Sequence, residues 1–88
     1  MYIYEQIKPE LFTDGGQKMF LAIRDAAHKL LEKAGAFREA EVLAGICGNT
    51  WEMSACVDRM VELGEIIELK RDCWEQYRVF TTPKVDNR

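Results

Sequence analysis

The chain has 88 residues and a mass of 10.2 kDa, which is enough for one domain and excludes two separate cores. Its 48% hydrophobic and 31% charged residues are typical of a chain that buries a core, unlike the apolar-poor composition of disordered proteins. Fifteen acidic and twelve basic side chains give a net charge of −3, so net charge does not draw this molecule toward a polyanion.

Cysteine and histidine usage argues against a metal centre and a catalytic triad. The three cysteines, Cys47, Cys56 and Cys73, are an odd number, and their spacings match neither a zinc-binding Cys-x-x-Cys pair nor a disulfide framework. His28 is the only histidine, and we interpret it as a residue of a helix surface. We therefore expect reduced thiols in a cytoplasmic protein that holds no metal and no cofactor.

Membrane and enzyme signatures are missing from the sequence. No apolar run approaches the roughly 18 to 20 residues that a membrane span needs, and the first residues lack the pattern of a signal peptide. We find no Gly-rich phosphate loop, no nucleophile elbow and no Cys–His pair with a catalytic spacing. The sequence thus predicts a protein that is neither an enzyme nor anchored in a membrane.

Residues 1–16 are predicted to form an N-terminal arm and a capping turn. The arm carries too many apolar side chains for a mobile tail, and we expect it to be partly helical: Tyr2, Ile3, Tyr4, Ile7, Leu11 and Phe12. Asp14 and Gln17 have the spacing of a capping box, which predicts the start of a helix. Apolar side chains then recur at helical intervals over residues 17–34, and Gly35 is a typical C-terminal cap.

Two shorter helices and a hairpin are predicted behind this first helix. Acidic residues lead the segment 38–46, where a second helix is expected. Asn49 or Thr50 is a suitable N-cap for a third helix that ends at Gly64. The segments 65–69 and 77–82 are rich in β-branched and aromatic residues, which predicts a two-stranded hairpin, followed by a polar tail over residues 83–88.

This order of elements resembles the winged helix-turn-helix superfamily over residues 17–82. In many winged-helix families an apolar residue four before a glycine and another directly before it pack inside, and an isoleucine soon after it opens the wing strand. Met60, Leu63, Gly64 and Ile66 occupy those positions. The resemblance implies an α+β fold of three helices and a C-terminal wing. It also implies a small prokaryotic or phage-type regulator without an effector domain, which places its third helix in the major groove of duplex DNA.

The third helix and the hairpin supply the candidate DNA-binding residues. With Met53 at the centre of the buried face, a rotation of about 100° per residue turns Trp51, Ala55, Asp58, Arg59 and Glu62 outward. Eight residues are candidates for contacts with DNA: Thr50, Trp51, Ser54, Ala55, Arg59, Lys70, Arg71 and Arg78. Arg59 suits a bidentate contact with guanine, and its alternative role is an i,i+3 ion pair with Glu62.

The charge of the residues around the third helix is unfavourable for DNA binding. Residues 36–65 carry two basic and six acidic side chains, a net charge of −4, whereas phosphate contacts need Lys or Arg. The basic side chains gather on the first helix and on the hairpin, where Arg71 could enter a narrow minor groove. The alternative for Lys70 and Arg71 is an ordinary solvated turn.

Five aromatic residues are candidates for contact with a protein partner: Tyr2, Tyr4, Phe12, Trp51 and Trp74. Alternatively, Trp51 folds back on the core and Trp74 covers the hairpin. The apolar arm is also a candidate for pairing two protomers. The second functional hypothesis is therefore an acidic winged-helix module that binds a protein partner, or a decoy that mimics nucleic acid.

Overall fold

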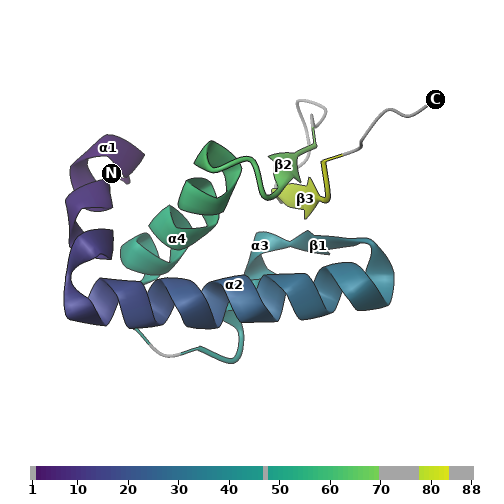
Figure 1. Ribbon diagram of the computed structural model, residues 1–88, viewed down its shortest axis with the longest axis horizontal. Helices are drawn as coiled ribbons and strands as arrows, with labels where there is room; N and C mark the ends of the chain where they lie inside the picture. Colours follow the sequence, from purple (N-terminus) through teal and green to yellow (C-terminus); the bar gives the residue numbers. More distant parts are fainter. Residues whose placement is uncertain (1, 47, 70–77, 84–88) are drawn as a thin grey trace.

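A computed structural model describes residues 2–46, 48–69 and 78–83 (Figure 1). The helical elements are α1 (Tyr4–Ile7), the 3-10 helix η1 (Lys8–Phe12), α2 (Asp14–Ala34), α3 (Glu39–Leu43) and α4 (Thr50–Glu62). The strands are β1 (Ala36–Arg38), β2 (Ile67–Glu68) and β3 (Val79–Thr81). The α+β class is confirmed, since a mostly helical chain carries a small antiparallel sheet of three strands.

The longest helix, α2, begins earlier than the capping pattern predicted. Thr13, not Asp14, is the N-cap, and its Oγ1 accepts a hydrogen bond of 3.0 Å from the backbone amide of Gly16. The Gln17 side chain donates to the carbonyl oxygen of Phe12 instead of closing a capping box. At the other end Gly35 adopts a left-handed conformation with φ of +80°, which confirms the predicted C-terminal cap.

The predicted helix over residues 38–46 is confirmed at its start to within one residue, but it ends three residues earlier, and a strand that was not predicted precedes it. Ala36–Arg38 forms the strand β1, and the helix α3 covers only Glu39–Leu43. The extended backbone lets the Phe37 ring stack on Phe80, with ring centroids 5.4 Å apart, and both side chains are buried. Helix α3 then starts where the backbone amide of Arg38 donates to the Glu41 carboxylate at 2.7 Å.

The sheet has the order β1-β3-β2, so the last strand of the chain lies in the middle. β3 pairs antiparallel with β1 through Phe37 and Phe80, and antiparallel with β2 through Ile67 and Thr81. The predicted hairpin strands are thus present, though shorter than the predicted segments. In Figure 1 the sheet lies at one end of the molecule, and α4 lies between it and the arm.

The core is enclosed by α2, α4 and the sheet. Its fully buried members are apolar and come from every part of the fold: Leu11, Ile23, Ala27, Phe37, Val42, Met53, Ala55, Cys56, Val57, Met60, Ile66 and Phe80. Leu11 belongs to η1, so the arm contributes to the same core as the domain. Within the described ranges, no helix is both long and apolar enough to cross a membrane.

The exit from α4 agrees with three of the four expected positions. Met60 and Ile66 are fully buried, and Gly64 reverses the chain with φ of +80°. Leu63 was expected inside, and this expectation is wrong, since its side chain is 47% exposed. Because the amide of Glu65 bonds to the carbonyl of Met60 at 2.9 Å, the reversal carries Ile66 into the core and leaves Leu63 outside.

Candidate functional site

The first turn of α4 presents the DNA-binding candidates that remain accessible. Asn49 is the N-cap, and its Oδ1 accepts hydrogen bonds from the backbone amides of Trp51 at 2.8 Å and Glu52 at 3.2 Å. Thr50 is exposed and Ser54 is half-buried. Trp51 is 44% exposed, so it does not fold back on the core. Its ring meets the edge of Tyr2 with centroids 6.5 Å apart.

Ala55 was predicted to face DNA, and the structure contradicts this. Its side chain is fully buried and belongs to the core. The reason is that α4 packs against four elements, α1, η1, α2 and α3, so the buried arc is wider than one face of a helical wheel. Ala55 can therefore take no part in a surface site.

The N-terminal arm crosses the second half of α4. The Tyr2 hydroxyl donates to the Asp58 carboxylate, and the Tyr4 hydroxyl donates to Glu62 at 2.6 Å. Lys8 forms an ion pair with Glu62 at 2.9 Å. Three of the aromatic candidates for partner contact, Tyr2, Tyr4 and Phe12, thus contact α4 of their own chain.

Arg59 and Phe12 complete this contact between the arm and α4. The guanidinium of Arg59 lies over the Phe12 ring, 5.4 Å from its centroid. Arg59 also donates to Glu62 at 2.9 Å in an i,i+3 ion pair, which is the alternative role weighed for it from the sequence. A base contact by Arg59 would have to break both interactions.

These contacts shift the titration of the groups that make them. Hydrogen bonds from Tyr4, Lys8 and Arg59 lower the pKa of Glu62 to about 2. Burial and the hydrogen bond to Asp58 raise the pKa of Tyr2 above its ordinary value. Burial and the bond to Glu62 do the same for the pKa of Tyr4. The tyrosines are therefore neutral donors, and the Glu62 carboxylate is a charged acceptor at neutral pH.

Arg78, a candidate for phosphate contact, is held by three carboxylates. Its guanidinium donates to Glu68 at 2.8 and 3.0 Å and to Asp58 at 2.7 Å, and it lies 3.5 Å from Glu39. The hydrogen bonds to Glu68 raise its pKa further above the ordinary value, despite partial burial. Arg78 joins β3 to α3, α4 and β2 and is not presented to a phosphate.

Other sequence candidates are spread over the molecule. Lys70, Arg71 and Trp74 lie outside the described residues. Cys56 is a buried free thiol, and burial raises its pKa to about 12. His28 is on the surface of α2 as expected, with its Nε2 3.8 Å from a carboxylate oxygen of Glu65. Across the described ranges, no three side chains of the metal-ligating types come together.

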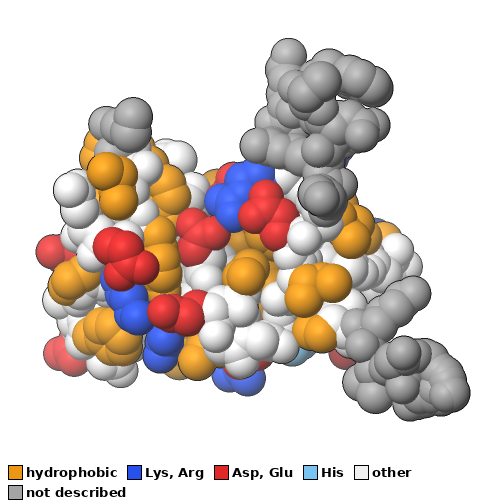
Figure 2. Space-filling model, turned by 90° about the horizontal axis from the view of Figure 1, so that it is seen from above, with side chains coloured by type: hydrophobic (Ala, Val, Ile, Leu, Met, Phe, Trp, Pro, Cys, Tyr) orange, Lys and Arg blue, Asp and Glu red, His pale blue; other side chains and the backbone are white. Residues whose placement is uncertain are grey.

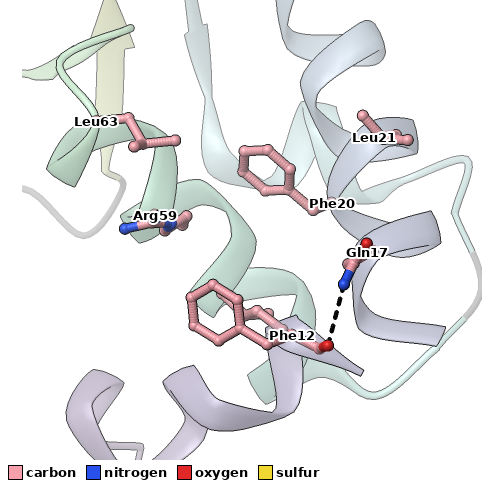
Figure 3. Close-up of a pocket in the computed structure, with 7 residues that line it drawn as sticks. Phe12, Gln17, Phe20, Leu21, Arg59 and Leu63 are labelled. Carbon is pink, nitrogen blue, oxygen red and sulfur yellow. Dashed lines mark hydrogen bonds between the residues drawn. The ribbon is translucent and has the colours of Figure 1, made fainter. Parts of the chain in front are cut away.

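An apolar groove that the sequence did not predict lies between η1, α2 and α4 (Figure 3). Its volume is about 270 Å³, and its lining is almost entirely apolar: Leu11, Phe12, Gln17, Phe20, Leu21, Arg59 and Leu63. Phe12 and Leu21 are 54% and 59% exposed. The one signal in the sequence was Leu21, an apolar residue on the polar side of the predicted first helix.

Charges of both signs are interleaved on the surface above α4. Figure 2 shows acidic and basic side chains side by side on this face, which agrees with the ion pairs Lys8–Glu62 and Arg78–Asp58. Arg24 likewise pairs with Glu65 at 2.9 Å. The acid excess of residues 36–65 is thus compensated by basic side chains from the arm, α2 and β3.

The chain was compared with models of protein families, with curated proteins and with solved structures, and none of the three comparisons gives a match.

Proposed function

We propose that the chain is a winged-helix domain that binds duplex DNA through the first turn of α4. The observation that supports this proposal most directly is the order of the elements along the chain, α2, β1, α3, α4, β2 and β3, together with the sheet order β1-β3-β2. The order of α2, α3 and α4 followed by β2 and β3 is the one expected of a helix-turn-helix followed by a wing, and β1 adds a third strand to that expectation. Helices α3 and α4 take the place of the helix-turn-helix, and β2 and β3 that of the wing.

The accessible residues at the start of α4 support this proposal. In helix-turn-helix proteins the N-terminal residues of the recognition helix contact base edges. Thr50 and Ser54 carry hydroxyls that bond to base edges or phosphates, and Trp51 offers a large exposed ring. The arm bonds to α4 further along, at Asp58 and Glu62, and in the first turn it meets one edge of the Trp51 ring through Tyr2, which leaves Trp51 44% exposed.

The acidic side chains of residues 36–65 argue less strongly against DNA binding once their partners in the structure are known. Asp58 bonds to Tyr2 and Arg78, and Glu62 bonds to Tyr4, Lys8 and Arg59. Paired carboxylates project less negative potential toward a docking duplex than free ones do. Binding would then depend on base-edge contacts and on few phosphate contacts.

Fluorescence anisotropy with a mixed pool of labelled duplexes tests the proposal. Thr50→Glu adds a carboxylate at the first position of α4, where the helix dipole tolerates it, so the fold should persist. We expect this variant to bind roughly tenfold or more weakly. Lys33→Gln, with the same charge change in the last turn of α2, is the control and should bind almost as the wild type does. No binding by the wild type at low salt, or equal loss in both variants, would overturn the proposal.

The second candidate function is protein binding, and the apolar groove favours it. Its volume of about 270 Å³ lies below the roughly 300–1,000 Å³ of pockets for drug-sized ligands, so it suits one large apolar side chain of a protein partner. Leu63 lines the groove and is 47% exposed, while Leu69 lies elsewhere and is 41% exposed. The two leucines therefore form a matched pair for substitution.

Affinity capture from the native host with Leu63→Glu and Leu69→Glu as baits tests this candidate. A partner held by the wild type and by Leu69→Glu, and lost with Leu63→Glu, should then bind the purified chain directly in calorimetry. A partner retained equally by both variants would exclude the groove. A purified partner that shows no direct heat of binding would exclude it as well.

A further inference from the structure

The face of α2 that points away from the core carries a regular run of charges around one leucine. Residues three or four apart on a helix share a face, and the five that form the outer stripe are all exposed: Asp14, Lys18, Leu21, Asp25 and Lys29. The exposed Glu32 continues this face beyond the stripe. Ile23 and Ala27, on the opposite side of the helix, are fully buried. This outer stripe is therefore free of contacts with the core of its own chain.

The charges of the outer stripe are antisymmetric about its centre. Read from either end, an acidic residue stands where the other direction has a basic one, with Leu21 and the exposed Ala22 in the middle. An identical helix laid antiparallel over it brings Asp14 opposite Lys29 and Lys18 opposite Asp25. A two-fold axis repeats each pair. Four ion pairs between oppositely charged side chains therefore surround the Leu21 side chains of the two copies.

We propose that α2 packs antiparallel against α2 of a second copy of this chain, through the outer stripe centred on Leu21. A two-fold interface needs a surface that is complementary to itself, and charge antisymmetry along a helix provides this. A parallel pairing would align like charges. An antiparallel pairing shifted to bring Leu21 opposite Asp25 would place Asp14 against Glu32. The charges thus select one orientation and one register.

The present contacts leave the stripe available. Among the described residues, Asp14 and Lys18 have no ion-pair partner, and Asp25 pairs only with Lys29 of its own helix at 3.2 Å. Both side chains of that pair are largely exposed. Leu21 is the most exposed large hydrophobic residue of the described chain, at 59%. A second copy would remove it from water and give the unpaired charges partners.

The expected association is weak and sensitive to salt. Exposed ion pairs contribute little to affinity, so the four pairs mainly fix geometry, while Leu21 and Ala22 supply apolar contact. The interface includes none of the residues of the first turn of α4, so it is independent of the proposed DNA binding, but it shares Leu21 with the apolar groove.

Charge reversal at Lys18 and Asp25 tests the pairing. Sedimentation velocity over about 5 to 500 µM should show a monomer–dimer equilibrium for the wild type. Lys18→Asp places two acids opposite each other, and Asp25→Lys places two bases, so each variant alone should associate about tenfold more weakly. An equal mixture of the two variants restores both pairs and should form a heterodimer. Lys33→Asp, the same change outside the stripe, should leave the equilibrium unchanged.

Three results would overturn the proposal: a wild type that stays monomeric over the whole range, reversals that leave a dimer intact, or a mixture that associates no better than its components. Circular dichroism of each variant separates lost association from lost folding. DNA binding is measured separately at concentrations where the chain is monomeric, so failure of either proposal leaves the other one standing.

Discussion

Gly16 lies where η1 of the arm packs closely against the start of α2. A Cβ at this position would lie well inside van der Waals distance of the carbonyl oxygen of Glu10 and of the backbone of Leu11. Gly15, one residue earlier in the same helical turn, has open space where its Cβ would lie. The absence of a side chain at Gly16 is therefore what lets η1 pack against the start of α2.

Gly16→Ala should destabilise the protein by about 1–3 kcal/mol, because backbone atoms cannot move aside as a flexible side chain can. Gly15→Ala is the matched control and should stabilise by about 0.5–1 kcal/mol, since alanine favours a helix. Urea denaturation followed by circular dichroism measures both free energies of unfolding. Equal stability of the two variants would contradict the close packing of η1 on α2.

The stability of the fold should depend on pH through the Glu62 carboxylate. Its pKa of about 2 is depressed below the usual value near 4.3, so the stability it contributes is present above the usual pKa. That stability is lost as the pH falls from about 5 toward 2. Glu62→Gln should therefore be less stable than the wild type at pH 7, and the difference should shrink across this range.

Denaturation at pH 7, 5, 4, 3 and 2 provides the comparison for Glu62. Glu32→Gln is a suitable control, because Glu32 is exposed on α2 and forms no ion pair with the described residues. The difference between wild type and Glu32→Gln should change little with pH. A constant difference for Glu62→Gln as well would mean that the bonds from Tyr4, Lys8 and Arg59 do not hold this carboxylate in solution.

At the scale of elements, the arm has a firmly held part and a lightly held part. η1 is anchored by the buried Leu11, whereas α1 contains no buried residue. The segment containing α1 is held to α4 by the tyrosine hydroxyls on Asp58 and Glu62 and by partial burial of their rings. Its removal should cost stability without unfolding the domain.

A chain that begins at Lys8 should stay folded, with a melting temperature several degrees lower. Loss of Tyr2 uncovers one edge of Trp51, so its fluorescence should shift to longer wavelength in a Trp74→Phe background. The double variant Tyr2→Phe/Tyr4→Phe keeps the rings and is the control for the hydroxyls alone. An unfolded truncation would show that α1 belongs to the core.

The elements that the sequence predicted well are those whose pattern is local. α2 and α4 are long enough for their apolar period to emerge, and Asn49 and Gly64 mark the ends of α4 by local geometry. The three-residue strand β1 could not be predicted, because it depends on a partner, Phe80, 43 residues later. The prediction for Ala55 failed for the same reason, since elements distant in sequence bury it. The prediction for Leu63 failed because the reversal at Gly64 turns its side chain outward.

At the scale of the whole molecule, the basic side chains that lie around α4 in the described part of the chain are engaged by carboxylates. The net charge is −3, and Lys8, Arg24, Arg59 and Arg78 are all engaged by carboxylates of their own chain. The ion pairs that neutralise carboxylates of residues 36–65 also occupy the basic side chains nearest to those carboxylates. Any complex with DNA must therefore form with few released counterions.

The salt dependence of DNA binding should accordingly be shallow. Each neutralised phosphate contributes about −0.9 to the slope of log K against log salt, so a slope no steeper than about −3 is expected. Anisotropy titrations at several salt concentrations measure it. Lys70 and Arg71 lie between β2 and β3 in the sequence, and replacing both by alanine should make the slope shallower by about 2 if they contact phosphates. A wild-type slope of about −6 or steeper would contradict this expectation.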